Sequence, residues 1–110
     1  MVKQIVWSRR AQTDRKHILK YWNKRNKSNL YSRKLNRLFK EAVKLIADYP
    51  KIGKPTDDKN ARIKIVKDYL IIYEVDEKDR LLILTIWDSR QDPKKLERIL
   101  RRKPTANKDV

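Results

Sequence analysis

The sequence predicts a single domain of the α+β class, and two patterns carry that prediction. Apolar residues recur at helical spacing between Arg9 and Tyr49, and the spacing changes to a period of two after Asn60. A short β-branched segment also precedes the helical part. The predicted order is an N-terminal strand, an α-helical hairpin, an antiparallel three-strand meander and a short C-terminal helix. This domain spans residues 1–100, and residues 101–110 are a basic tail that we expect to be flexible.

The first half of the chain supplies the strand and the hairpin. Val2–Trp7 is rich in β-branched and aromatic residues and predicts a strand at an edge of the sheet. Ser8 is a suitable N-cap for a helix over Arg9–Arg25, and Asn26–Asn29 predicts a turn. A second helix then runs to Pro50. The apolar stripe that we expect on its core side consists of Tyr31, Leu35, Leu38, Ala42, Leu45 and Tyr49, with Phe39 and Ile46 beside it.

The second half predicts the meander. A polar loop over Lys51–Asn60 precedes three strands, Ala61–Val66, Tyr69–Val75 and Leu81–Trp87, which are joined by short turns. The last two strands are apolar on both faces, so we expect them in the centre, with helices on one face and another element on the other. A final helix starts at Pro93 or Lys94 and ends near Leu100.

The register between the first two strands of the meander stays open. A two-residue turn aligns Lys64 with Ile71, whereas a three-residue turn aligns it with Leu70. Trp7, Trp87, Tyr69 and Tyr73 belong either to the core or to a face that binds a partner.

Composition excludes several classes of function. The chain has no cysteine, one glycine and one histidine, His17, so we expect neither a thiolate metal site nor a glycine-rich phosphate loop. We expect no metal and no cofactor. No apolar segment approaches the roughly 18 residues of a membrane span, and the N-terminus has no secretory pattern, so we expect a cytoplasmic protein with no membrane partner.

The net charge of +16 points to a polyanionic partner, either a nucleic acid or an acidic protein. Residues 1–50 contain 14 Lys and Arg against 3 acids, a net charge of +11. Arg33, Lys34 and Arg37 lie opposite the apolar stripe of the second helix, so they are candidate nucleic-acid-binding residues. The alternative is an ordinary solvated helix face.

Three cations are candidates for stabilising a phosphate in a ribonuclease reaction. Arg62 and Lys64 alternate with Ile63 and Ile65, so they project from one side of a strand, and Arg90 follows the last strand. Guanidinium and ammonium groups stabilise the charge of a phosphorane, while Lys64, Tyr69 or Tyr73 are candidates for proton transfer. The alternative is that Arg62 and Lys64 are solvent-side residues of an amphipathic strand. We expect His17 and the pair Asp57-Asp58 to be surface residues.

Three segments resemble the RelE/ParE superfamily of toxins from type II toxin–antitoxin modules. They are the opening IVWSRRAQTD, the segment LIADYPKIGK and the hairpin YLIIYEVDEKDRLLILTIWDSRQDPKKL, and the resemblance spans Lys3 to Leu100. It implies a toxin that arrests growth and is neutralised by a cognate antitoxin, commonly through an acidic segment. It also implies one of two modes of action: ribosome-dependent cleavage of mRNA, or inhibition of DNA gyrase without nuclease activity.

The resemblance carries the ribonuclease roles to Arg62, Lys64 and Arg90. The sequence departs from the family pattern at two positions. Leu70 stands where an arginine commonly follows the first tyrosine of the hairpin strand, and Leu96 lies near the place of a C-terminal tyrosine or histidine. The sequence therefore leaves mRNA cleavage and gyrase inhibition both open.

Overall fold

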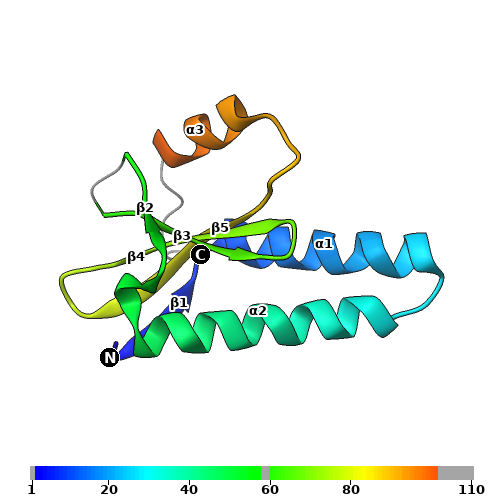
Figure 1. The fold of residues 1–110 in the computed structure, drawn as a ribbon, viewed down its shortest axis with the longest axis horizontal. Coiled ribbons are helices and arrows are strands. Elements are labelled where there is room, and N and C mark those ends of the chain that lie inside the picture. Colours follow the sequence, from blue (N-terminus) through cyan, green and yellow to red (C-terminus); the bar gives the residue numbers. More distant parts are fainter. Residues whose placement is uncertain (1, 58–59, 102–110) are drawn as a thin grey trace.

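A computed structural model describes residues 2–57 and 60–101. Its elements are β1 (Gln4–Trp7), α1 (Arg9–Asn26), α2 (Leu30–Asp48), a 3-10 turn η1 (Pro50–Ile52), β2 (Lys54–Pro55), β3 (Arg62–Val66), β4 (Tyr69–Val75), β5 (Arg80–Asp88) and α3 (Pro93–Arg101). Figure 1 shows the sheet between α2 on one side and α3 on the other. The α+β class and the predicted order of elements are confirmed. Of the predicted tail, Arg101 belongs to α3, and residues 102–110 lie outside the described part of the chain.

One five-stranded sheet has the order β1-β5-β4-β3-β2. The antiparallel meander β3–β4–β5 is confirmed, and β1 occupies an edge as predicted, where it pairs in parallel with β5. Lys64 pairs with Ile71, so the two-residue turn at Lys67-Asp68 is the correct alternative. Lys67 has a φ of 56°, the left-handed conformation that such a tight hairpin turn requires. The predicted loop over Lys51–Asn60 is corrected in part, since it contains η1 and the short edge strand β2.

Ser8 joins the start of α1 to the sheet. Its hydroxyl oxygen accepts a hydrogen bond from the backbone N–H of Ala11 at 2.9 Å, and the hydroxyl donates to the carbonyl of Leu84 at 2.7 Å. The predicted N-cap is therefore confirmed, and the cap also fixes where α1 begins relative to β5.

The core has two parts, one on each face of the sheet. The larger part packs both long helices against one face and includes Leu35, Phe39, Ile71 and Ile83. The second part lies on the opposite face and consists of Ala61, Ile72, Leu84 and Trp87, against which Ile63, Leu70, Leu82, Leu96, Ile99 and Leu100 are packed. The expectation that β4 and β5 are central and covered on both faces is confirmed.

The core side of α2 differs from the predicted stripe. Leu45 is 38% exposed and Tyr49 is 64% exposed, so the prediction of a core position was wrong for these two residues. The buried residues are centred on Leu35, Phe39 and Ile46, with Val43 towards one flank. The shift arises because α1 packs along one side of α2, so the buried surface of α2 turns towards α1.

Candidate functional site

Arg62 and Tyr73 hold the segment that connects α2 to β2. Nη1 of Arg62 donates hydrogen bonds to the carbonyl oxygens of Gly53 at 2.7 Å and Lys51 at 3.2 Å. The Tyr73 hydroxyl accepts from the N–H of Gly53 at 2.9 Å and donates to the carbonyl of Pro50 at 2.7 Å. A Cβ atom on Gly53 would lie only 2.5 Å from the Tyr73 hydroxyl, so only glycine fits there. The Arg62 guanidinium thus already serves the fold.

Arg90 pairs with Asp88 directly after β5. Its Nε and Nη2 atoms lie 3.0 and 2.9 Å from the two carboxylate oxygens, and its backbone N–H donates to the same group at 2.9 Å. The hydrogen bonds from Arg90 hold the pKa of Asp88 below its usual value, and they raise the pKa of Arg90. The guanidinium side chain is 56% exposed, so solvent screens this ion pair.

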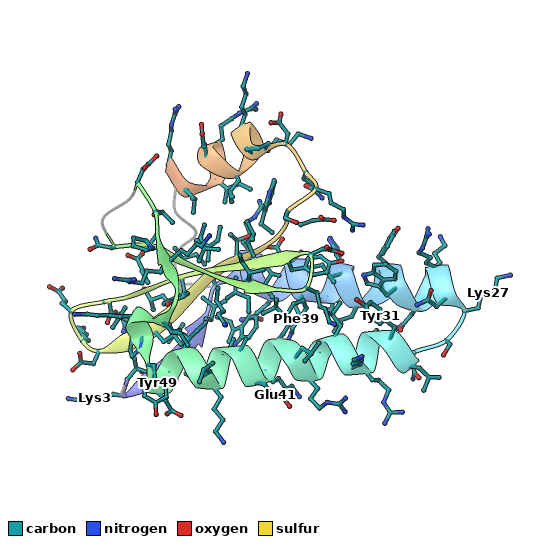
Figure 2. All side chains as sticks on the ribbon, in the orientation of Figure 1. Lys3, Lys27, Tyr31, Phe39, Glu41 and Tyr49 are labelled. Atoms are coloured by element: carbon teal, nitrogen blue, oxygen red, sulfur yellow. The ribbon has the colours of Figure 1, made fainter. Side chains whose placement is uncertain are left out.

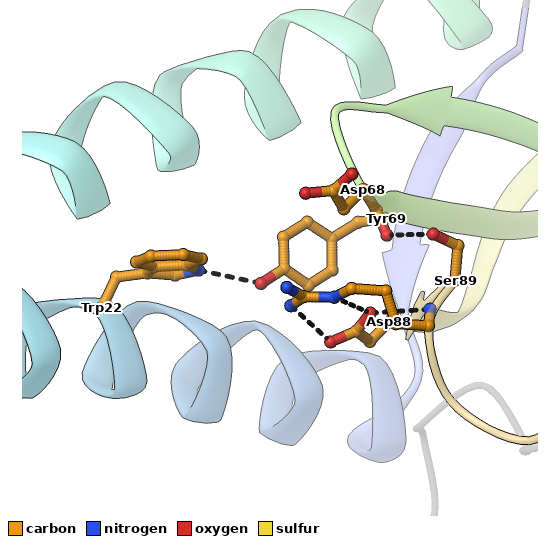
Figure 3. A network of polar contacts seen from close by, with 6 residues as sticks. Trp22, Asp68, Tyr69, Asp88 and Ser89 are labelled. Carbon is orange, nitrogen blue, oxygen red and sulfur yellow. Dashed lines mark hydrogen bonds and ion pairs between the residues drawn. The ribbon is translucent and has the colours of Figure 1, made fainter.

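Tyr69 lies beside this pair at the start of β4 (Figure 3). Its hydroxyl accepts a hydrogen bond from Nε1 of Trp22 at 2.8 Å, and its ring packs edge-on against Phe39 with centroids 5.7 Å apart. Burial raises the pKa of the Tyr69 phenol and also that of the Tyr73 phenol, which makes both less able to exchange a proton at neutral pH. Tyr69, Tyr73 and Trp87 are buried, so of the two roles left open for them the core is the correct one.

The three candidate cations are spread along the sheet. Arg62 pairs with Tyr73 in β4, whereas the start of β4 at Tyr69 pairs with Asp88. The two positions, Tyr73 and Tyr69, are four residues apart in β4, roughly 13 Å at about 3.3 Å per residue. Lys64 lies between them, opposite Ile71. The structure therefore brings Arg90 close to Tyr69, and it places Arg62 towards the other end of β4.

Leu70 and Leu96, the two departures from the family pattern, meet in the second part of the core. Leu70 lies on β4 and Leu96 on α3, and both pack against the cluster that contains Ile72 and Trp87. Where the resemblance implies an arginine and a proton-transfer residue, this chain has two apolar side chains in the same buried cluster. Ile63, on β3 between the two candidate cations, packs there as well. This face of the sheet is an apolar surface covered by α3.

A cleft of about 430 Å³ lies between α1 and the end of β5, where no sequence pattern predicted one. Its lining residues are Arg10, Asp14, His17, Ile18, Tyr21, Tyr69, Ile86, Trp87, Asp88, Arg90 and Gln91. The expectation of a surface position for His17 agrees with its exposure. The cleft contains two cations that are both paired with acids, Arg10 with Asp14 and Arg90 with Asp88. Its charge is therefore largely balanced internally.

Asp14 closes an open edge of β5. Because β1 ends at Trp7, the N–H of Ile86 has no strand partner on that side, and it donates to the Asp14 carboxylate at 3.1 Å. The Thr85 hydroxyl donates to the same oxygen at 2.5 Å. Burial raises the pKa of Asp14 above its usual value, against the lowering effect of these hydrogen bonds.

This pKa shift predicts a pH dependence of stability. The pKa of Asp14 is raised in the folded state above its unfolded value of 3.8, so protonation of this carboxyl group favours the folded state. Its stabilising contribution is fully present below pH 3.8 and is lost as the pH rises through the folded pKa. Replacement by asparagine removes the titration. The free energy of unfolding of the wild type, relative to Asp14→Asn, should therefore rise as the pH falls from about 7 to about 4. Urea denaturation at several pH values measures this difference, and a difference that shrinks as the pH falls would contradict the prediction.

The nucleic-acid-binding candidates lie on α2, and all three are exposed. Arg33 and Arg37 are four residues apart and share one face of the helix, whereas Lys34 is turned about 100° from Arg33.

Neither a helix long and apolar enough to cross a membrane nor a metal-binding group of three His, Cys, Asp or Glu residues occurs in residues 2–57 and 60–101. Asp57 is exposed, and Asp58 lies outside the described residues.

Comparison with known proteins supports the resemblance. Residues 5–93 match the family model described as ParE toxin of type II toxin-antitoxin system, parDE. No curated protein matches the chain. The family match covers most of the chain, from β1 to the start of α3. The chain therefore belongs to the ParE toxin family of type II toxin–antitoxin systems, within the RelE/ParE superfamily.

Proposed function

We propose that this toxin arrests growth by binding and inhibiting DNA gyrase, and that it does not cleave RNA. The observation that carries the proposal is the apolar cluster formed by Leu70, Leu96 and Trp87. A ribonuclease needs charged and titratable groups around a phosphate. Here two of the positions expected to supply them are filled by leucines, Leu70 on β4 and Leu96 on α3, which pack against the same apolar cluster. A toxin that acts by binding needs no such groups.

The hydrogen bonds of the candidate cations also argue against RNA cleavage. Arg62 donates to two backbone carbonyls, and Arg90 forms a two-point contact with Asp88. A phosphate at Arg62 would have to compete with these internal acceptors, and it would lie roughly four strand residues from the Arg90 end of the sheet. The two buried tyrosines have raised pKa values, which disfavours them as bases.

The direct test combines two assays of the purified chain. Supercoiling of relaxed plasmid by gyrase should fall in the presence of the toxin, while mRNA in a cell-free translation mixture should stay intact. A toxin mixed in advance with its antitoxin is the control, since the complex should leave supercoiling unaffected. Cleavage of mRNA on ribosomes together with normal supercoiling would overturn the proposal.

Ribosome-dependent cleavage by Arg62, Lys64 and Arg90 is the second candidate, because Arg90 is exposed at the cleft beside Tyr69 and is able to reach a ligand. The variant Arg90→Ala separates the two candidates. Under the gyrase proposal we expect the growth rate after induction of the variant to stay within about twofold of that with the wild-type toxin. The contacts of Arg90 are made within the protein, and an exposed ion pair contributes little to stability.

Growth curves after induced expression measure this effect, with Arg98→Ala on the exposed side of α3 as a matched control. Far-ultraviolet circular dichroism establishes that both variants are folded. If Arg90→Ala abolishes growth arrest while Arg98→Ala does not, Arg90 has a functional role and the cleavage candidate gains over the gyrase proposal.

Membership of a type II toxin–antitoxin family implies an antitoxin partner. We infer that an acidic segment of the antitoxin binds this toxin in the cytoplasm, because the chain carries a net charge of +16. The association rate should fall steeply as the salt concentration rises. Stopped-flow mixing at several salt concentrations measures it, and a rate independent of salt would contradict an acidic contact surface.

A further inference from the structure

The helical hairpin carries a long segment of uncompensated positive charge. Residues 15–40 contain ten Lys and Arg and no Asp or Glu. Salt bridges elsewhere in the described chain join Arg10, Arg80 and Arg90 to nearby aspartates. No such pair within residues 2–57 and 60–101 involves a cation of this segment. Its charge is therefore available to an external partner.

The cations form two rows on α1 and α2. Lys16, Lys20 and Lys24 follow one another at intervals of four residues on α1, while Arg33, Arg37, Lys40 and Lys44 follow at intervals of four, three and four on α2. All seven are exposed. Such intervals keep side chains on one face of a helix. We call these seven residues the cationic face.

Both rows point away from the sheet. On α1, Lys20 is about 180° from buried Ala11 around the helix axis, and on α2, Lys44 is about 180° from buried Leu35. Because α1 and α2 pack side by side on the same face of the sheet, the two rows cover the outer side of this helical layer. One acid shares this outer side, because Glu41 lies between Lys40 and Lys44 in sequence and Figure 2 shows it below the ribbon, away from the sheet.

The spacing of the charges suits a partner with a dense, regular series of anions. Neighbouring cations in a row are about 4.5–6 Å apart along the helix axis, and packed helix axes are about 8–10 Å apart. A DNA duplex carries one negative charge per about 1.7 Å of its axis, so it can meet several of these cations at once.

Peptide partners and single strands fit this face less well. A peptide that orders on a surface buries apolar anchor residues, and an unpaired strand stacks its bases on aromatic rings. The exposed large apolar residues within or next to the two rows, Tyr21 and Leu45, are turned about 100° around the helix axis from Lys20 and Lys44. Leu30 comes before the α2 row at the tip of the hairpin. The exposed apolar residues Tyr49 and Ile52 lie past the opposite end of α2.

We infer that the cationic face binds the sugar–phosphate backbone of duplex DNA without reading its sequence. The choice of DNA over RNA rests on the proposed function, since gyrase acts on DNA. Contact with the DNA adds to contact with the enzyme and holds the toxin on the gyrase–DNA complex. Bound alone, the toxin should show the salt-dependent micromolar or weaker affinity that is typical of non-specific phosphate contacts.

Fluorescence anisotropy with a labelled DNA duplex of about 24 base pairs tests this inference on the purified chain without gyrase. One variant combines Lys16→Gln, Lys20→Gln and Lys24→Gln, and a second combines Arg37→Gln, Lys40→Gln and Lys44→Gln. The control combines Lys3→Gln, Lys78→Gln and Lys94→Gln, which removes the same charge from exposed positions elsewhere. Each row variant should bind at least about tenfold more weakly at about 100 mM salt. The slope of log K against log salt should shrink by roughly 0.9 for each phosphate that the variant no longer neutralises.

The affinity of the control variant for the DNA duplex should stay within about threefold of the wild-type affinity, because the cations that it replaces lie outside the cationic face. Equally weakened binding by the control and row variants would overturn the inference, as would tighter binding to an RNA duplex, to single-stranded DNA or to polyglutamate of matched charge. The supercoiling assay is independent of this measurement. A toxin that binds DNA through the cationic face but leaves gyrase active would refute the proposed function alone, and the reverse result would refute this inference alone.

Discussion

Tyr73→Ala should lower the free energy of unfolding by about 3–5 kcal/mol, because it removes a fully buried ring and leaves a cavity. It also removes the hydroxyl that joins β4 to Gly53 and Pro50. Tyr73→Phe keeps the ring but leaves one N–H and one carbonyl without this partner, so it should cost about 1–3 kcal/mol. Urea denaturation followed by circular dichroism measures both values.

The same pair of variants tests a catalytic role of Tyr73. Under the gyrase proposal, Tyr73→Phe should still arrest growth at temperatures where it is folded, because the hydroxyl serves the fold alone. Loss of growth arrest in a folded Tyr73→Phe protein would instead support proton transfer by this phenol. Equal destabilisation by Tyr73→Phe and Tyr73→Ala would show that the ring contributes little, contrary to its burial.

Trp87→Ala should destabilise the protein by a similar amount, about 3–5 kcal/mol, since the indole is 6% exposed in the cluster between β5 and α3. It should also loosen α3 selectively, because α3 has no fully buried residue of its own and depends on this cluster. Limited trypsin digestion at native temperature should then cut within α3 at Lys94, Lys95 or Arg98 before it cuts elsewhere.

Leu19→Ala on α1 is a useful comparison, because that side chain packs on the other face of the sheet. It should destabilise the protein without favouring early cleavage in α3. If α3 is cut equally early in both variants, the apolar cover over Leu70 is weaker than its packing indicates, and a ribonuclease site on that face becomes possible again.

Local patterns predicted most of the fold. Ser8 was predicted as the cap of α1 because a serine hydroxyl satisfies a free N–H at the start of a helix, whatever the tertiary context. The edge strand β2 was not predicted because two residues, one of them Pro55, carry no periodicity. Leu45 and Tyr49 were assigned to the core because α2 has apolar residues around much of its circumference, and spacing alone does not tell which side a neighbouring helix covers.

The site was less predictable. Alternation predicted that Arg62 and Lys64 project from one side of β3, but it did not predict the acceptors of the Arg62 guanidinium, which are carbonyl oxygens nine and eleven residues earlier in the chain. Asp14 carried a usable signal, since it is the only acid in residues 1–40. A lone carboxylate in so basic a segment indicates a specific partner, which here is the open edge of β5 at Ile86.

The order of amino acids was sufficient for the strongly basic charge, the succession of elements and the family, because each depends on composition or on neighbours along the chain. Three-dimensional packing was needed to place Arg62 and Arg90 at opposite ends of β4, to bring Leu70 and Leu96 into one buried cluster, and to align the cations of two helices into one face. Spacing along a chain fixes the side on which a residue projects, whereas register and helix packing fix its distance from residues remote in sequence.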